Sequence, residues 1–193
     1  MIADTPEKKN FSQHANIWGI LTNTFPVDLQ AGILNKILTK KDIAQSSYYF
    51  KFYLIKALEK TGLADKFLTL LEPWKHMLNI GLTTFAEKPD PTRSDCHAWS
   101  ASPVYYLLSL VCGIKPNEPG FKSVRIEPHL GNLNRIDGSM PHHLGNIRVS
   151  LNKDKLGGLK GEIILPNSLK GVLTWKNQNI QLKGGLNQIH LKK

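Results

Sequence analysis

Apolar residues recur at helical spacing through the first part of the chain. Residues 12–24, 27–40 and 46–62 place apolar side chains three and four positions apart, which predicts three helices. Two shorter helices are predicted over 64–71 and 73–79. The pattern therefore indicates a helical region that begins near residue 12.

The residues at the ends of these segments support the predicted helices. Ser12 is suited to cap the first helix, and Pro26 ends it. Ser46 or Ser47 is suited to cap the third helix, and Gly62 to close it. The third helix is apolar on nearly all sides, so we expect its neighbours to enclose it.

The apolar period changes near residue 113. A strongly apolar helix, 103–112, is expected to be buried, and after it apolar and polar residues alternate in short runs. The predicted strands are 124–126, 147–151, 159–165, 171–175, 179–183 and 186–192. Turn residues separate these runs every eight to twelve positions, as in a small antiparallel β-sandwich. We expect an α module, residues 1–113, followed by a β module, residues 114–193.

Composition is that of a globular protein. The chain has 193 residues, of which 41% are hydrophobic and 21% charged, with a formal net charge of +10. Residues 115–193 hold 13 Lys and Arg against 5 Asp and Glu. Most of these lysines stand singly at strand spacing, which favours the solvent face of a sheet over a nucleic-acid patch. We therefore expect no nucleic-acid partner.

Several classes of protein are not supported by the sequence. No apolar run is long enough for a membrane span, and no secretory signal is visible at the start. No G-x-S-x-G, phosphate-binding loop or zinc-ligand spacing occurs, so neither a cofactor nor a metal is expected. The two cysteines, Cys96 and Cys112, fit a pair of core thiols better than a disulfide.

The segment 81–102 lies between two apolar helices and is rich in polar residues. It combines carboxylates such as Glu87 and Asp95 with the aromatic side chains of Phe85 and Trp99. Carbohydrate sites use this combination, because an aromatic face packs on a sugar ring while polar groups hold its hydroxyls.

The alternative for this segment is a solvated loop. Asp90 and Asp95 would then be local caps, and Glu87 would pair with Lys88 or Arg93. Composition alone leaves both interpretations open.

Three strings carry a resemblance to a known family. They are FSQHANIW at 11–18, GLTTFAEKPDPTRSDCHAWSASP at 81–103 and GFKSVRIEPHLG at 120–131. They resemble the C-terminal part of bacterial inverting α-L-rhamnosidases, and the resemblance covers nearly the whole chain. It implies a partial (α/α)6 barrel, residues 1–113, followed by a small antiparallel β-sandwich, residues 114–193.

The resemblance also implies roles for part of a site. It makes Glu87 the catalytic base that activates water, and it places His97 in the sugar pocket with Asp95 and Trp99 close by. Phe85 stands where the family commonly has tryptophan, which suggests a subgroup. The implied partner is a rhamnose-containing oligosaccharide, polysaccharide or glycoside.

An inverting glycosidase also needs a protonated carboxylic acid on the leaving-group side. The resemblance places this acid in the earlier half of the barrel, before residue 11. Glu7, Glu59 and Glu72 are instead interpreted as helix-surface charges. We therefore expect a fragment that supplies the base, lacks the acid and is inactive without the N-terminal half of the barrel. Intact relatives are usually exported, whereas this chain does not show its own location.

Two alternatives belong to other functional classes. The β module could be a non-catalytic carbohydrate-binding or packing module left from a truncated gene. Trp175 would then be either a sugar platform or a core residue. A basic nucleic-acid binder would require a clustered positive patch.

Overall fold

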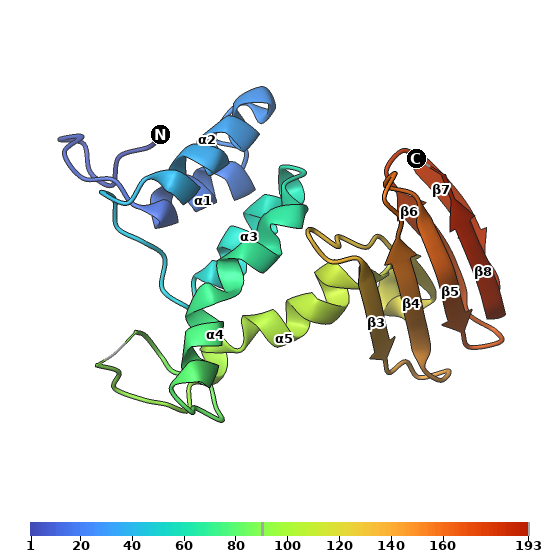
Figure 1. Cartoon of the computed structure of the whole chain (residues 1–193). Coiled ribbons are helices and arrows are strands. Elements are labelled where there is room, and N and C mark those ends of the chain that lie inside the picture. The colour runs from blue at the N-terminus through green and yellow to red at the C-terminus, as the bar shows by residue number, and fades with distance from the viewer. Residues whose placement is uncertain (90, 193) are drawn as a thin grey trace. The chain divides into compact units, whose positions relative to one another are not determined.

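A computed structural model describes residues 1–89 and 91–192 (Figure 1). The chain divides into two compact units, Met1–Pro103 and Val104–Lys193. The first is helical, and the second consists of a short helical segment followed by strands. An α region followed by a β region is thus confirmed.

Six helical segments lie wholly within the described part of the first unit. They are α1 (Gln13–Leu21), α2 (Val27–Thr39), α3 (Lys51–Lys60), the 3-10 helix η1 (Ala64–Leu71), α4 (Glu72–Asn79) and the 3-10 helix η2 (Ala98–Ser100). Ser12 caps α1 as predicted, because its hydroxyl accepts a hydrogen bond from the Ala15 amide at 3.2 Å. Pro26 occupies the N-cap position of α2, whereas α1 has already ended at Leu21. The prediction that Pro26 ends the first helix is therefore wrong by several residues.

Helix α3 is shorter than predicted. Ser47 accepts a hydrogen bond from the Phe50 amide at 3.3 Å, but this bond closes a turn that precedes the helix. Ser46 instead donates its hydroxyl hydrogen to the Gln13 side chain at 2.8 Å. At the other end, Gly62 adopts a φ of 72°. This left-handed conformation ends the helix as the sequence predicted.

Two apolar clusters lie in the described part of the helical unit. Helices α1, α2 and α3 share the first cluster, which includes the fully buried Ile17, Leu34 and Leu58. The second contains Tyr48 and Trp74 and lies against the segment that follows α4. Residues 51–59 of α3 are buried or half-buried, and Lys60 at its end is exposed. The expected enclosure therefore holds for most of the helix, but it fails for Tyr49, which lies in the turn before α3 and is 38% exposed.

A buried amide links α1 to the chain around residue 45. The Gln13 side chain donates to the Ile37 carbonyl at 2.9 Å and accepts from the Ser46 amide at 2.9 Å. Gln13 is 3% exposed, so these partners offset the desolvation of its amide group.

The apolar segment before the strands consists of α5 (Ser102–Tyr106) and the π-helix η3 (Leu107–Val111). Tyr106 and Leu110 are buried as predicted. Val104 and Tyr105, in contrast, are 57% and 51% exposed, so the expected burial holds for one face only.

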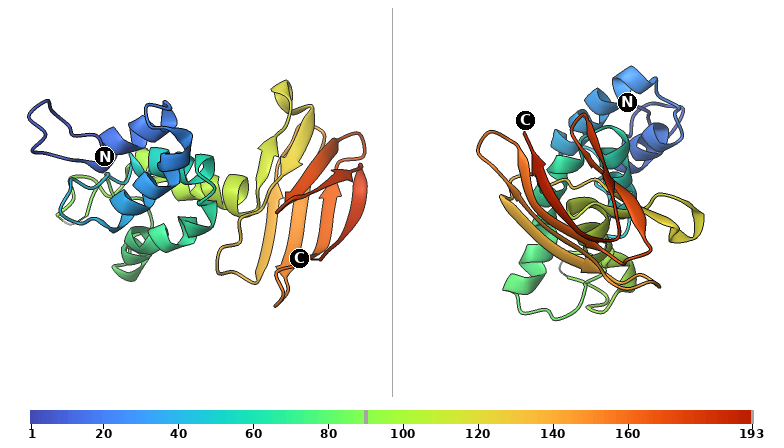
Figure 2. Two further views of the ribbon diagram at one scale, coloured as in Figure 1. Left: turned by 90° about the horizontal axis from the view of Figure 1, so that it is seen from above. Right: turned by 90° about the vertical axis from the view of Figure 1, so that its right-hand side faces the viewer.

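Two four-stranded sheets form the β unit (Figure 2). The strands are β1 (Ile114–Pro116), β2 (Ser123–Ile126), β3 (Arg135–Met140), β4 (Ile147–Lys153), β5 (Leu159–Leu165), β6 (Lys170–Trp175), β7 (Gln178–Leu182) and β8 (Gly185–Leu191). The strand orders are β1-β2-β6-β7 and β3-β4-β5-β8. The predicted sandwich is confirmed, but β2 and β6 run parallel, so the first sheet is mixed rather than antiparallel.

Alternating burial explains which strands the sequence predicts. In β4, Ile147, Val149 and Leu151 are buried and Arg148 is exposed. Strands β1 and β3 were not predicted: β1 ends in proline, and β3 has one buried side chain, Ile136. Their positions are set by pairing with β2 and β4.

The two cysteines have different environments. Cys112 is buried beside β3, and a Cβ added at Gly138 would meet its Sγ at 2.5 Å. Cys96 is exposed, so the expectation of two core thiols is wrong for this residue. Both are free thiols. Within the described residues, no helix is long and apolar enough to cross a membrane.

Candidate functional site

The segment between α4 and α5 carries the candidate site, and two backbone hydrogen bonds shape it. The Glu87 amide donates to the Ser94 carbonyl at 2.9 Å, and the His97 amide donates to the Phe85 carbonyl at 2.7 Å. These bonds bring the chain before Lys88 alongside the chain after Arg93. Glu87 and His97 are thereby held on neighbouring stretches of backbone.

The apolar cluster under this segment anchors it. Ala86 is 4% exposed and packs with Trp74, and Phe85 joins the same cluster. The buried Trp74 Nε1 donates to the Ser100 carbonyl at 2.7 Å. The residues beside Glu87 and His97 are therefore tied to α4 by burial and by a hydrogen bond.

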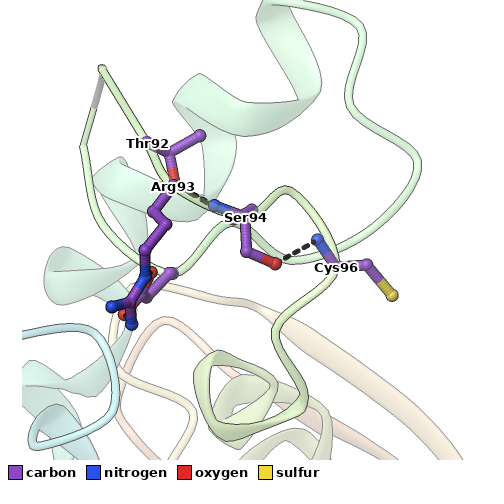
Figure 3. A network of polar contacts seen from close by, with 5 residues as sticks. Thr92, Arg93, Ser94 and Cys96 are labelled. Atoms are coloured by element: carbon purple, nitrogen blue, oxygen red, sulfur yellow. Dashed lines mark hydrogen bonds and ion pairs between the residues drawn. The ribbon is translucent and has the colours of Figure 1, made fainter.

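The far end of the segment is held by short-range polar contacts (Figure 3). The Thr92 hydroxyl donates to the Ser94 carbonyl at 2.9 Å and accepts from the Ser94 amide at 3.3 Å. The Ser94 hydroxyl accepts from the Cys96 amide at 3.3 Å. These bonds turn the backbone between Arg93 and His97 without regular secondary structure.

Glu87 and Arg93 form a two-pronged ion pair. Arg93 Nε donates to Glu87 Oε2 at 2.9 Å, and the second guanidinium nitrogen contacts Oε1. The Arg93 hydrogen bond lowers the pKa of Glu87, and the charges of Arg93, His97 and Lys88 act in the same direction. Glu87 is therefore ionised at neutral pH.

The ion pair leaves part of the carboxylate available. A carboxylate offers about four lone-pair positions, and the Arg93 fork uses two. The Glu87 side chain is 21% exposed. An ionised, partly exposed carboxylate of this kind can accept a hydrogen bond from water.

The structure places the other predicted site residues around His97. The rings of His97 and Trp99 lie 6.1 Å apart, centroid to centroid, and Trp99 is 66% exposed. Trp99 also lies against Tyr49, with centroids 4.8 Å apart. The three rings form an aromatic surface from two separate segments of the chain.

Asp95 takes a different place in this arrangement. Its side chain is exposed, and its backbone carbonyl accepts the hydrogen bond from the Thr84 hydroxyl. Asp90, suggested as a cap, lies outside the described residues. The suggested pairing of Glu87 with Arg93 is present.

Sequence patterns missed Tyr49 as part of this surface. It falls in the run Tyr48 to Tyr53, which the spacing assigned to a buried helix. The aromatic character of the run was the available signal, but exposure of one ring depends on how the chain turns before α3. Among the described residues, no cluster of three His, Cys, Asp or Glu could hold a metal ion.

The sequence analysis assigned three glutamates, Glu7, Glu59 and Glu72, to helix surfaces. Glu59 pairs with Lys56 at 3.4 Å and Glu72 with Lys75 at 2.6 Å, each on its helix. Glu7, expected on a helix surface, lies in the turn region before α1.

In the β unit, Trp175 is 8% exposed, so it is a core residue and not a sugar platform.

Comparisons with known proteins identify relatives of both units. Residues 113–181 match the family described as the bacterial alpha-L-rhamnosidase C-terminal domain. The chain has no match among curated proteins.

Solved structures match most of the chain. The rhamnosidase of Bacillus sp. GL1, described as a GH78 family member, is 26% identical, with a TM-score of 0.77. The match covers 88% of this chain and 19% of that one. The native α-L-rhamnosidase of Aspergillus terreus is 18% identical, with a TM-score of 0.81, covering 93% and 24%.

A further structure is that of the Streptomyces avermitilis α-L-rhamnosidase in complex with L-rhamnose. It is 17% identical, with a TM-score of 0.70, over 93% of this chain and 20% of that one. This chain therefore spans about a quarter or less of the length of these three enzymes.

Proposed function

We propose that this chain, which corresponds to a C-terminal part of an α-L-rhamnosidase, supplies the water-activating base of such an enzyme. The reaction is hydrolysis of a terminal α-L-rhamnoside with inversion at the anomeric carbon. Glu87 accepts a proton from the attacking water, and the new C–O bond forms on the face opposite the leaving group.

The two-pronged contact of Arg93 with Glu87 is the observation that carries this proposal. A base must be deprotonated at the working pH, and the Arg93 fork lowers the pKa of Glu87. Arg93 also fixes the direction of the carboxylate, so the free lone pairs point to one side. This stabilisation makes Glu87 a weaker base, but it keeps the group charged and positioned.

His97 and Trp99 are the proposed sugar contacts. The exposed Trp99 ring offers a flat apolar face for the C–H groups of a sugar, and His97 offers a ring nitrogen to a hydroxyl. Asp95 is exposed next to them and is a further candidate for a hydroxyl contact. The substrate class is a rhamnose-containing oligosaccharide, polysaccharide or glycoside.

The proposal assigns the general acid to residues outside this chain. All the charged groups that shift the pKa of Glu87 are basic. General acid catalysis contributes about 10²- to 10⁴-fold. The 193-residue chain alone should therefore hydrolyse rhamnosides poorly or not at all.

The test uses an aryl α-L-rhamnoside and two proteins. One is the 193-residue chain, and the other is the same chain joined to the N-terminal part of a full-length α-L-rhamnosidase. We expect turnover only in the longer protein, and β-L-rhamnose as the first product by NMR. Glu87→Gln should abolish that turnover while titration still detects L-rhamnose binding.

A matched substitution controls for general damage. Glu72→Gln removes a surface carboxylate of the same unit and should leave turnover unchanged, because Glu72 pairs with Lys75 on α4 and lies outside the proposed site. In Glu87→Ala, azide should restore reaction by attacking where water did. Normal turnover in Glu87→Gln would refute the proposed role of Glu87 as base. Hydrolysis by the 193-residue chain would refute the proposal that the general acid lies outside it.

A further inference from the structure

The outer face of the mixed sheet is hollowed. A cavity of about 540 Å³ lies over β2, β6 and β7. Its polar lining comes from Asn117, Ser123, Arg125, Glu127, Lys170, Thr174, Asn179 and Gln181. Val172 and Gly171 complete the floor. The described lining residues all belong to the β unit, and none belongs to the loop that carries Glu87.

Alternation along the strands directs these side chains outward. In β2, Val124 and Ile126 are buried in the sandwich, so Arg125 between them lies on the opposite face. In β6, Leu173 is fully buried and Thr174 next to it lines the hollow. The same residues that build the core thus fix the direction of the polar ones.

The strand register arranges the polar groups in rows. Arg125 pairs with Val172, and Val172 pairs with Gln181, which makes one row across three strands. Thr174 and Asn179 form a second row, joined by a hydrogen bond of 2.9 Å. Because neighbouring strands are about 4.8 Å apart, the donors and acceptors stand at regular intervals.

Three charged side chains are among the described residues that line the hollow. Within the described part of the chain, Arg125, Glu127 and Lys170 make no side-chain ion pair or hydrogen bond. Elsewhere in the same unit, Arg135 and Asp137 do pair, at 2.6 Å. Both signs of charge and the Gln181 amide are therefore available to a ligand, whereas Asn117 bonds to Ser123 and Thr174 to Asn179.

We propose that this hollow binds an oligosaccharide chain. Sugar hydroxyls both donate and accept hydrogen bonds, so they suit a surface that offers guanidinium, ammonium, carboxylate and amide groups together. Val172 supplies a small apolar contact for the sugar C–H face. No aromatic residue is among the described lining residues, so binding is weak and gains from the length of the chain.

Binding at the hollow does not depend on the catalytic role proposed for Glu87. The proposed function enters only in the choice of a rhamnose-containing probe, and binding here does not need Glu87. The Glu87→Gln variant should therefore bind the oligosaccharide at the sheet face as the parent does. Failure of one proposal leaves the other intact.

The experiment is an NMR titration of the full 193-residue chain. The probes are L-rhamnose and a rhamnose-containing tetrasaccharide, each raised into the millimolar range. We expect the tetrasaccharide to shift backbone amides of β2, β6 and β7, with smaller changes from the monosaccharide. Gln181→Ala and Arg125→Ala should each weaken binding about threefold to tenfold, the cost of a lost hydrogen bond.

Gln188→Ala is the matched control. Gln188 is an exposed glutamine on β8 of the other sheet, so its loss should leave the titration unchanged. Shifts confined to the loop around Glu87, or equal affinity in all three variants, would overturn the proposal. Loss of binding in the control as well would show non-specific association and would also overturn it.

Discussion

Apolar side chains are buried in different ways in the β-sandwich and in the helical unit. In the sandwich, alternate residues of strands such as β4 and β5 enter one shared interior, and Leu151 and Ile163 are fully buried. The described part of the helical unit has two separate apolar clusters, and rings such as Trp18 and Trp99 are exposed. The proposed catalytic residue, Glu87, lies in this helical unit.

The difference shows how each unit positions its functional groups. In the sandwich, the register of whole strands sets the outward side chains of the hollow. In the helical unit, a few individual bonds hold the loop, including the one from Trp74 to the Ser100 carbonyl. We therefore expect substitutions that remove a single hydrogen bond to disturb the loop more than the sandwich. Substitutions that disturb core packing should affect the sandwich more than the loop.

The largest effects should come from truncating each core. Leu151→Ala in the sandwich and Leu34→Ala in the helical unit both remove fully buried side chains. Each should lower the free energy of unfolding by about 2–5 kcal/mol, from lost burial and the cavity left behind. Urea denaturation followed by NMR of both units should show each variant weakening its own unit first. Equal loss of both units in either variant would mean that they unfold together.

Alanine at two glycines should separate backbone clash from backbone strain. A Cβ at Gly161 would lie 2.1 Å from the Ser150 carbonyl oxygen, at a φ of 142°. Gly161→Ala should cost about 1–3 kcal/mol in strain and a further 1–3 kcal/mol or so in overpacking. Gly62 has a φ of 72° but nothing within 4 Å, so Gly62→Ala should cost the strain alone. Thermal unfolding would check this order, and a larger effect at Gly62 would contradict it.

Trp74→Phe tests the anchor of the loop. It removes the Nε1 donor and leaves the Ser100 carbonyl without that partner, at a cost of about 1–3 kcal/mol. Hydrogen exchange of the His97 amide should become faster, because the loop is less firmly held. Trp18→Phe is the control, since Trp18 is 44% exposed. Unchanged exchange in Trp74→Phe would show that other contacts hold the loop.

The smallest effect concerns pH. Arg93 lowers the pKa of Glu87 from its ordinary 4.5, so the ion pair stabilises the loop above that value. Its contribution is lost as pH falls through the lower pKa of the folded state. A carboxyl NMR titration should find the Glu87 pKa below 4.5 in the parent and closer to 4.5 in Arg93→Gln. The same pKa in both would remove the ion pair as the cause.

Much of the fold could be predicted from local patterns. Strand β5 spans Leu159–Leu165, the predicted bounds, because its alternation and flanking turns are local properties. Helix α2, at Val27–Thr39, was predicted to within one residue for the same reason. The parallel pairing of β2 with β6 could not be predicted, since it joins segments far apart in the chain.

For the candidate site, the sequence by itself determined which chemical groups are present. It placed Glu87, Arg93, His97 and Trp99 within one polar segment, and a family resemblance attached roles to three of them. It also determined the alternation that turns Arg125 outward. These are properties of residue type and spacing, which short-range physics translates directly into local structure.

Only the tertiary structure decided which groups meet. In the structure Glu87 pairs with Arg93, Tyr49 lies against Trp99, and Trp175 is buried. It also aligned residues from β2, β6 and β7 into one hollow. Each outcome depends on contacts between distant segments, whose energies are set by the packing of the whole unit and not by the local sequence.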